Sequence, residues 1–495
     1  MSPPISTPPI DWFELGIPLI PLAAGVVCLL AAVLAPRGWR RPFAATVCAL
    51  GFAGALVASA ILYAHAADAH GVIADAVQRD RLGALAQMVV GGIGVLIVAV
   101  SYEEPMADDH IAEYYALLSW AGAGMIFLVT ANSLMTLFLG LEWFSISLYI
   151  LCAIDIELVG SLEAGLKYLI IGSFGSAMLL FGSALVYGAT GELRFHAIAD
   201  AVQAQNLSHD ALLVAGLAFV IGGLAFKASA APFHMWTPDV YEGAPTPVTG
   251  FMSAATKAVA LVVMLRVLVT AFPQEAHLWT VTIAVIACCS LAVGNLAALV
   301  QNNVKRMLAY SSISQAGFML IPISTNSALG GRAILYFLIP YSAMSVGAFG
   351  VVAARERELN QPVTFDNLAG FGWERPLLGA AMTVFMLGFA GLPLTGGFVA
   401  KFYALAAAYE HGWAWLVIVG VAATAVSLYY YLGIIRAMYM RPSEELQLAP
   451  VVGGSPPPER PLQAAVAAAL VITVTSFILV QPLIDGARHA ANAIF

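Results

Sequence analysis

Charged residues are scarce in this 495-residue sequence: Asp, Glu, Lys and Arg make up 10% of it, against roughly 25% in a typical soluble domain. No acidic or basic tail concentrates the net charge of -8, so the charge pattern gives no sign of nucleic-acid binding. The segments between apolar runs are too short for an independent catalytic domain. The chain is 61% hydrophobic, and apolar runs of about twenty residues recur throughout it. This composition predicts an all-α polytopic membrane protein.

Cysteine is also rare, and its spacing does not suit a metal site. The five cysteines (Cys28, Cys48, Cys152, Cys288 and Cys289) all lie in apolar runs. We therefore expect packed thiols, with no disulfide framework, no iron–sulfur cluster and no metal site in this chain. The N-terminal stretch MSPPISTPPIDWFE lacks the basic region of a secretory signal, so the first apolar run is expected to be a retained span.

The apolar runs predict about fourteen transmembrane helices. They fall near residues 14–35, 43–65, 82–101, 112–131, 133–153, 162–189, 211–242, 247–271, 278–300, 304–323, 330–354, 376–408, 413–438 and 462–484. The longer connections are 191–210, 355–375 and 441–461, and the last contains a proline- and glycine-rich linker that cannot be helical throughout.

Positive residues predict the orientation, because cytoplasmic loops carry an excess of Lys and Arg. Of the 21 Lys and Arg residues, eleven lie on the side reached after the first span, five on the other side and five within spans. The eleven are Arg37, Arg40, Arg41, Lys305, Arg306, Arg355, Arg357, Arg375, Arg436, Arg441 and Arg460. That side is therefore predicted to be cytoplasmic, with both termini on the periplasmic side.

Only five of the cations are lysines, and four of these lie inside predicted spans. A lysine can lose its proton when it is desolvated, whereas a guanidinium stays protonated, so this distribution suits a proton-carrying role. Ionisable residues at membrane depth are costly and usually functional. Lys227, Lys257 and Lys401 lie well inside their spans. Lys167 and Lys305 lie near span ends, where snorkelling toward the interface is an alternative explanation.

Two predicted spans contain a break as well as a lysine. In the stretch GGLAFKASAAPFHMWTPDVYEGAPTPVTG, Lys227 precedes Pro232, and His234 follows as a further candidate. In the stretch MTVFMLGFAGLPLTGGFVAKFYALAAAY, Lys401 follows Pro393 and its flanking glycines. Broken helices are tolerated in a membrane where they are buried in protein or line a wet cavity. These two breaks therefore indicate a transport element.

The two breaks are five spans apart, and a five-span repeat inverts its topology. We therefore expect two inverted five-helix repeats, spans 4–8 and 9–13, with discontinuous helices 7 and 12. This predicts four units: residues 1–107 with three N-terminal helices, 108–271 with the first repeat, 276–440 with the second, and 441–495 with the linker and last helix.

Glu142, within the fifth span, is the acidic counterpart of these lysines. A buried carboxylate must be paired, hydrogen-bonded or protonated. Pairing with Lys227 would keep both groups charged, and moving Glu142 would change the ease with which Lys227 holds its proton. A purely structural ion pair, or a hydrogen bond from Glu142 to a hydroxyl such as that of Ser145, is the alternative.

Several stretches resemble one family of membrane proteins. These are AFKASAAPFHMWTPDVYEGAPTPVTGFMSAATKA, NSLMTLFLGLEWFSISLYIL, GLKYLIIGSFGSAMLLFGSALVYGATGEL, NNVKRMLAYSSISQAGF and GLPLTGGFVAKFY. They are similar to the proton-antiporter family of membrane subunits, and the form HMWTPDVYEGAPTPVT is similar to the subunit N branch in bacterial NADH-quinone oxidoreductase (respiratory complex I). The resemblance covers roughly residues 80 to 440. Lysine in span 12 differs from the glutamate of subunit M, and the long lateral helix of subunit L is not expected.

The resemblance implies a proton relay. Glu142, Lys227, Lys257 and Lys401 match the family's relay positions in spans 5, 7, 8 and 12, and Lys167 and Lys305 match further polar positions. It also implies a location in the bacterial inner membrane, among lipids, beside antiporter-like subunits M and L and small membrane subunits. Through these the chain would join a peripheral redox arm. NADH, FMN, iron–sulfur clusters and quinone would belong to partner subunits.

Two other functions use the same features. A subunit of a cation/proton antiporter complex would have the same fold and the same lysines, and a structural membrane scaffold could retain the lysines without using them. Co-purification with NADH-oxidising partners would favour the redox-driven complex over the cation/proton antiporter. Retained pumping after loss of Lys227 would favour the structural scaffold.

Overall fold

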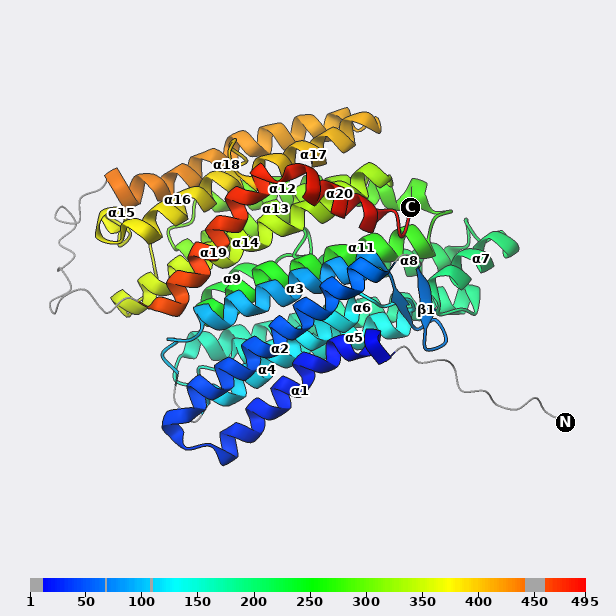
Figure 1. Cartoon of the computed structure of the whole chain (residues 1–495). Helices are drawn as coiled ribbons and strands as arrows, with labels where there is room; N and C mark the ends of the chain where they lie inside the picture. The colour runs from blue at the N-terminus through cyan, green and yellow to red at the C-terminus, as the bar shows by residue number, and fades with distance from the viewer. Residues whose placement is uncertain (1–11, 67–68, 107–109, 441–458) are drawn as a thin grey trace.

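The computed structural model describes residues 12–66, 69–106, 110–440 and 459–495, which form a bundle of long helices running along one common direction (Figure 1). The elements of the first half are α1 (Trp12–Leu34), α2 (Arg37–His65), β1 (His70–Val72), β2 (Val77–Arg79), α3 (Arg81–Val100), α4 (Ile111–Leu128), α5 (Leu134–Cys152), α6 (Val159–Thr190), α7 (Phe195–Gln205), α8 (Ala211–Lys227), α9 (Trp236–Gly243), α10 (Thr246–Phe251), the π-helical turn η1 (Met252–Thr256) and α11 (Lys257–Ala271). Those of the second half are α12 (Ala276–Ala298), α13 (Val304–Ile323), α14 (Ala328–Leu359), α15 (Phe371–Glu374), α16 (Pro376–Ala390), α17 (Gly396–Glu410), α18 (Ala414–Met440), α19 (Arg460–Ile478) and α20 (Val480–Ala491).

Eleven helices among the described residues are long and apolar enough to cross a membrane, with α10, η1 and α11 counted as one. The other three predicted spans coincide with α8–α9, α13 and α16–α17. α8 and α16 are shorter apolar helices of 17 and 15 residues. α13 carries Lys305 and Arg306 in its first turn and three serines further along, which lowers its mean hydropathy. The structure is therefore that of a polytopic helical membrane protein, as predicted.

Three features depart from the predicted helical pattern. Residues 70–79 form a small antiparallel hairpin, β1–β2, which an all-α prediction omits. The predicted loop 191–210 contains α7, whose buried residues Phe195, Ile198, Ala199 and Val202 follow helical spacing along one face. The last span, predicted as one helix over 462–484, ends at Ile478 and is followed by the separate helix α20. Most of the predicted linker 441–461 lies outside the described residues.

Both predicted breaks are present. α8 ends at Lys227, and the chain resumes as α9 at Trp236. α16 ends at Ala390 and α17 begins at Gly396, with Gly391 in the left-handed region at φ +79°. A glycine adopts this conformation without the steric cost that a Cβ would impose. The interruptions therefore follow from the proline and glycine residues that the sequence places there.

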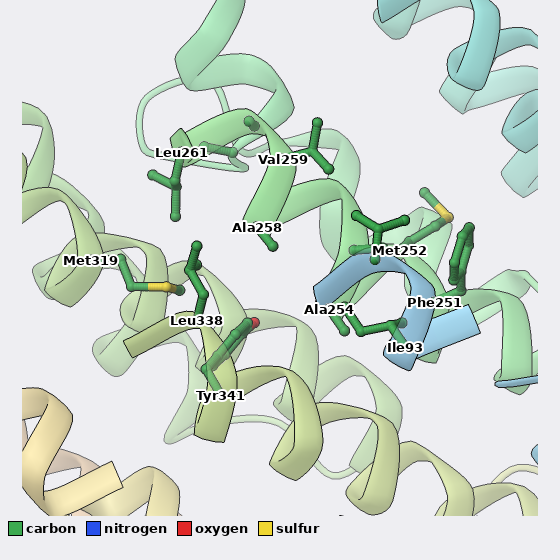
Figure 2. Close-up of a cluster of buried hydrophobic side chains, with 14 of the residues drawn as sticks. Ile93, Phe251, Met252, Ala254, Ala258, Val259, Leu261, Met319, Leu338 and Tyr341 are labelled. Carbon is green, nitrogen blue, oxygen red and sulfur yellow. The ribbon is translucent and has the colours of Figure 1, made fainter. Parts of the chain in front are cut away.

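The segment α10–η1–α11 crosses the middle of the bundle and is buried along almost its whole length. Figure 2 shows its side chains packed among those of α3, α13 and α14; the labelled residues are Ile93, Phe251, Met252, Ala254, Ala258, Val259, Leu261, Met319, Leu338 and Tyr341. Lys257 is the first residue of α11 and is 0% exposed. An ionisable group therefore lies in a deeply buried, apolar segment of the molecule.

The two ends of the bundle differ in what they carry. Figure 1 shows α7, the β1–β2 hairpin and the C-terminal residue at one end, and α15 at the opposite end. The connections 191–210 and 355–375, which contain α7 and α15, thus lie at opposite ends of the bundle.

Candidate functional site

Lys227 lies at the C-terminal end of α8, where the helix breaks, and is 1% exposed. The last carbonyls of a helix lack intrahelical donors. Here the carbonyl of Phe226 accepts bonds from the indole of Trp236 at 3.2 Å and from the amide of Ser229 at 3.0 Å. The hydrogen-bond partner of the Lys227 side chain lies outside α8.

That partner is a hydroxyl of α5. The Lys227 ammonium donates to Ser145 Oγ at 2.8 Å, and Ser145 in turn donates to the carbonyl of Leu141. Four aromatic rings surround the ammonium with centroids 5.5–5.7 Å from Nζ, those of Phe144, Tyr149, Tyr168 and Phe226. Ring faces attract a cation, with a strength of about 0.5–2 kcal/mol per contact. The site therefore holds the ammonium with neutral groups.

Glu142 does not form the expected direct ion pair with Lys227. It lies one helical turn before Ser145 on α5, and Ser145 takes the ammonium. The Oε1 atom of Glu142 is buried and lacks a hydrogen-bond partner in the described part of the chain. Glu142 also lines a cavity of about 660 Å³ with His110, Glu113 and Tyr149. The carboxylate is therefore close to the lysine site along α5, and the cavity that it lines is also lined by Tyr149, one of the rings around the ammonium.

Lys257 follows a widened helical turn, the π-helical turn Met252–Thr256. Such turns are rare and are frequently found at functional sites. The Lys257 ammonium contacts the hydroxyl of Ser312 on α13. Next to it, Ser253 of the same turn shares a hydrogen bond with Ser345 of α14 at 2.7 Å. Lys257 is thus buried with a hydroxyl as its polar partner.

Lys401 lies on α17, just after the second break, and is 5% exposed. Its ammonium donates to the carbonyl of Ala390, the last residue of α16, at 3.4 Å. It also lies 4.2 Å from the ring centroid of Phe318 on α13. As at Lys227, a broken helix end and an aromatic ring provide the surroundings.

The other predicted residues occupy a different region. Lys167 pairs with Asp239 at 2.8 Å and Glu163 at 2.7 Å and is 39% exposed. Lys305 is buried, donates to the carbonyl of Ala244 at 2.9 Å, and lies 3.7 Å from Glu356. Both line a cavity of about 610 Å³. Lys167 and Lys305 therefore belong to a network of ion pairs, unlike Lys227, Lys257 and Lys401, each of which is bonded to one neutral acceptor.

His234 lies between the two halves of the first break, as predicted, and is partly exposed. Its Nδ1 atom is buried without a hydrogen-bond partner among the described residues. The residue thus lies in the break, and no hydrogen bond in the described part of the chain joins it to Lys227.

Several polar residues that complete these sites are not predicted by the sequence patterns. Ser312 is the partner of Lys257, and Arg306 joins Asp239 and Glu242 at 2.7 Å each. Tyr431 and Gln315 form a hydrogen-bonded group beside the end of α16. The only signal in the sequence is the concentration of hydroxyl and amide side chains in the segment 311–315, SSISQ, inside an apolar run.

Comparisons with known proteins agree with these features. Residues 131–427 match the family model described as "NADH:quinone oxidoreductase/Mrp antiporter, TM". The chain is 44% identical over 358 residues to NADH-quinone oxidoreductase subunit N of Trichlorobacter lovleyi, covering 72% of this chain and 73% of the relative. It is 38% identical to subunit N 2 of Roseiflexus castenholzii, covering 97% and 96% of the two chains.

Solved structures show the same fold. A chain of respiratory complex I from Thermus thermophilus superimposes with a TM-score of 0.79 at 32% identity, covering 95% of this chain and 98% of that one. A chain of the Mrp complex from Dietzia sp. superimposes with a TM-score of 0.84 at 21% identity, covering 97% of each chain. The second likeness concerns the fold alone.

Proposed function

The chain belongs to the subunit N family of NADH-quinone oxidoreductase, and from this premise we propose that it carries protons across the membrane through a relay formed by Glu142, Lys227, Lys257 and Lys401. As a subunit of this enzyme it is a membrane component of a multisubunit complex. Electron transfer from NADH to quinone in partner subunits would drive the relay. NADH, FMN, the iron–sulfur clusters and the quinone would all be bound by those partners.

The observation that carries the proposal is the environment of three buried lysines. Lys227, Lys257 and Lys401 are each 5% exposed or less. In the described part of the chain each has one neutral hydrogen-bond acceptor and no carboxylate at ion-pair distance. Lys227 and Lys401 lie beside interrupted helices, and Lys257 follows the π-helical turn of a continuous helix. A proton must cross about 30 Å of hydrocarbon, and desolvated lysines that can bind and release a proton are suitable stations.

Glu142 would act as the switch. It is joined to the Lys227 site by one turn of α5, through Ser145. A movement of the carboxylate toward or away from the ammonium would change the electrostatic potential at Lys227 without any contact having to break. Lys167, Lys305 and His234 would have supporting roles, the first two in the ion-pair network around the 610 Å³ cavity.

The breaks also support the proposed inverted repeats. Each interrupts a helix beside a relay lysine, and in each the chain continues after a short non-helical segment. Under this proposal residues 108–271 and 276–440 are the two repeats, residues 1–107 contain three preceding helices, and 441–495 contain the last.

Co-purification tests whether the chain is a subunit of an NADH-oxidising complex, and a pumping assay tests whether that complex transports protons. An affinity tag on this chain should purify NADH–quinone oxidation activity from detergent-solubilised membranes. Inverted vesicles containing the complex should acidify when NADH is added, in sodium-free buffer. Purification without NADH-oxidising partners, together with transport that requires sodium ions, would instead assign the chain to a cation/proton antiporter complex.

Orientation in the bacterial inner membrane is tested separately. We propose that Gln361 lies on the cytoplasmic side and Gln203, near the opposite end of the bundle, on the periplasmic side with both termini. Both residues are exposed. Single cysteines at these positions in a cysteine-free background should react with an impermeant reagent from opposite sides. Labelling of both from one side would overturn the orientation.

A further inference from the structure

The C-terminal end of α16 has two backbone carbonyls that receive side chains from two other helices. Gly391 turns the chain away after Ala390, so the final carbonyls of α16 have no continuing helix to donate to them. These carbonyls also carry the partial negative charge of a helix C-terminus. The carbonyl of Phe389 accepts a bond from the amide of Gln315 on α13 at 2.9 Å. The carbonyl of Ala390 accepts the ammonium of Lys401 on α17 at 3.4 Å.

Gln315 is itself held firmly in this position. It is 2% exposed, and its Nε2 atom also donates to the hydroxyl of Tyr431 on α18 at 3.1 Å. That hydroxyl lies 2.5 Å from Ser311 Oγ. The ring of Tyr431 stacks on the ring of Phe389, with centroids 5.9 Å apart and planes at 19°. The amide is therefore fixed against the end of α16 by a network that spans three helices.

One face of α13 contacts both the helix end and the lysine. Ser311, Gln315 and Phe318 are spaced four and three residues apart, which places them on one side of a helix. The ring of Phe318 lies against the Lys401 ammonium, as described above. This face of α13 therefore lies against both the end of α16 and the Lys401 ammonium.

We propose that Gln315 is a positioning residue for Lys401, acting by engaging the Phe389 carbonyl and so weakening it as an alternative acceptor for the ammonium that is bonded to Ala390. The inference rests on the proposed relay and adds a residue to it. With the amide removed, the Phe389 carbonyl becomes a second acceptor for the ammonium. Lys401 is then held more tightly at the helix end and releases its proton less readily.

The test compares two buried glutamines. Gln315→Met keeps the approximate length of the side chain and removes its N–H donors. Gln87→Met on α3 is the control, because Gln87 is 0% exposed and its Nε2 atom donates at 3.4 Å to the carbonyl of Ile126 and to Glu14 Oε1, neither of which belongs to the proposed relay. Proton pumping, NADH–quinone oxidation and complex content are measured in inverted vesicles over a range of pH. Gln315→Met should lower pumping per complex roughly fivefold, about the effect of one hydrogen bond, and should shift the pH profile of pumping. Gln87→Met should leave the profile where it is.

The controls separate this inference from the relay on which it depends. If Lys401→Ala pumps normally, the proposed relay itself fails. If Lys401→Ala stops pumping while Gln315→Met pumps with an unchanged pH profile, only the positioning role is overturned. If Gln315→Met does not assemble, Tyr431→Phe takes its place, with Tyr430→Phe as its control because Tyr430 bonds to Asn295 instead. Tyr431→Phe should give a smaller shift in the same direction, and equal behaviour of the two tyrosine variants would overturn the proposal.

Discussion

Buried cations in this protein occur in two contrasting settings. At one of them, Arg266 of α11 pairs with Asp80, the residue that caps α3. Its two terminal nitrogens reach the two carboxylate oxygens at 2.5 and 2.9 Å, and both side chains are at most 2% exposed. A bidentate pair of this kind fixes both geometry and charge.

The second setting is that of the relay lysines. Lys227, Lys257 and Lys401 are as deeply buried as Arg266, yet each is bonded to a hydroxyl or a backbone carbonyl. A neutral acceptor stabilises the ammonium less than a carboxylate does. The guanidinium cannot release its proton, whereas the ammonium can.

The difference separates cations that hold helices together from cations that can change their protonation state. Arg266 lies on the same helix as Lys257, nine residues away, so the two settings occur within one structural element. The structural cation joins α11 to α3, and the relay cation faces α13. The predictions below alter one setting at a time.

The largest effect is expected from breaking the arginine pair. Asp80→Asn leaves the Arg266 guanidinium buried without its counter-charge, which destabilises a protein by about 3–5 kcal/mol. Assembled complex in membranes, measured by native gel and by NADH-oxidising content, should fall sharply. Asp485→Asn is the control, because Asp485 pairs with Arg488 at the surface, with side chains 35% and 50% exposed, and such pairs contribute about 1 kcal/mol or less. Equal complex content in the two variants would contradict the structural role of Arg266.

Removal of a relay lysine should spare assembly but not transport. Lys401→Ala removes a proton-binding group whose only bonded acceptor in the described residues is a single carbonyl. Proton transfer through this chain should slow by roughly 100-fold, as for loss of a positioned proton-transfer group. Pumping normalised to complex content is the measurement. A variant that lost complex content as severely as Asp80→Asn would show that the lysine has a structural role like that of the arginine.

Glu142 and Lys227 should behave as one unit. Each single change removes one half of an electrostatically coupled pair, so Glu142→Gln, Lys227→Ala and the double variant should be strongly non-additive in pumping rate. Glu142→Asp should pump better than Glu142→Gln, because the charge is retained at shorter reach. A double-mutant cycle in inverted vesicles gives the coupling. Losses that simply multiply would show that Glu142 acts independently of Lys227.

The smallest effect concerns the buried carboxyl of Glu275, which forms no ion pair with Lys or Arg among the described residues. Glu275 precedes α12, is 0% exposed, and both of its carboxylate oxygens lack hydrogen-bond partners in the part of the chain that the structure describes. Burial raises the pKa of the Glu275 carboxyl above its usual value. The folded state therefore binds this proton more tightly than the unfolded state, and stability is lost as pH rises through the folded pKa.

Glu275→Gln removes this pH dependence. The variant complex should therefore be slightly more resistant to thermal inactivation than wild type at pH 7, and the advantage should disappear at acidic pH. Thermal inactivation of the purified complex at several pH values is the measurement. An advantage that is the same at every pH would point to packing rather than to the proton.

The sequence predicted the helices, both breaks and the lysines because these are local features. Pro232 and Pro393 lie in the two breaks together with glycines or a left-handed residue, and a lysine in an apolar run can be recognised from the sequence alone. The partners of the lysines could not be predicted, since Ser311 and Ser312 differ by about 100° around the axis of α13. Only packing decides that Ser312 contacts Lys257 while Ser311 contacts Tyr431.

Packing also explains why the ion pair predicted between Glu142 and Lys227 does not form. Glu142 and Lys227 have opposite charges and both lie within predicted spans. The orientation of α5, however, places Ser145 next to the ammonium. The widened turn Met252–Thr256 has no proline or glycine of its own to mark it.

The most direct measurement is proton pumping by the Lys227→Arg variant in reconstituted vesicles, normalised to assembled complex. Arginine keeps the positive charge and can donate to Ser145, so assembly should be close to normal. If Lys227 must release its proton, the arginine variant should pump far less than wild type, because a guanidinium stays protonated. Full pumping by Lys227→Arg would contradict the distinction between structural arginine and transporting lysine.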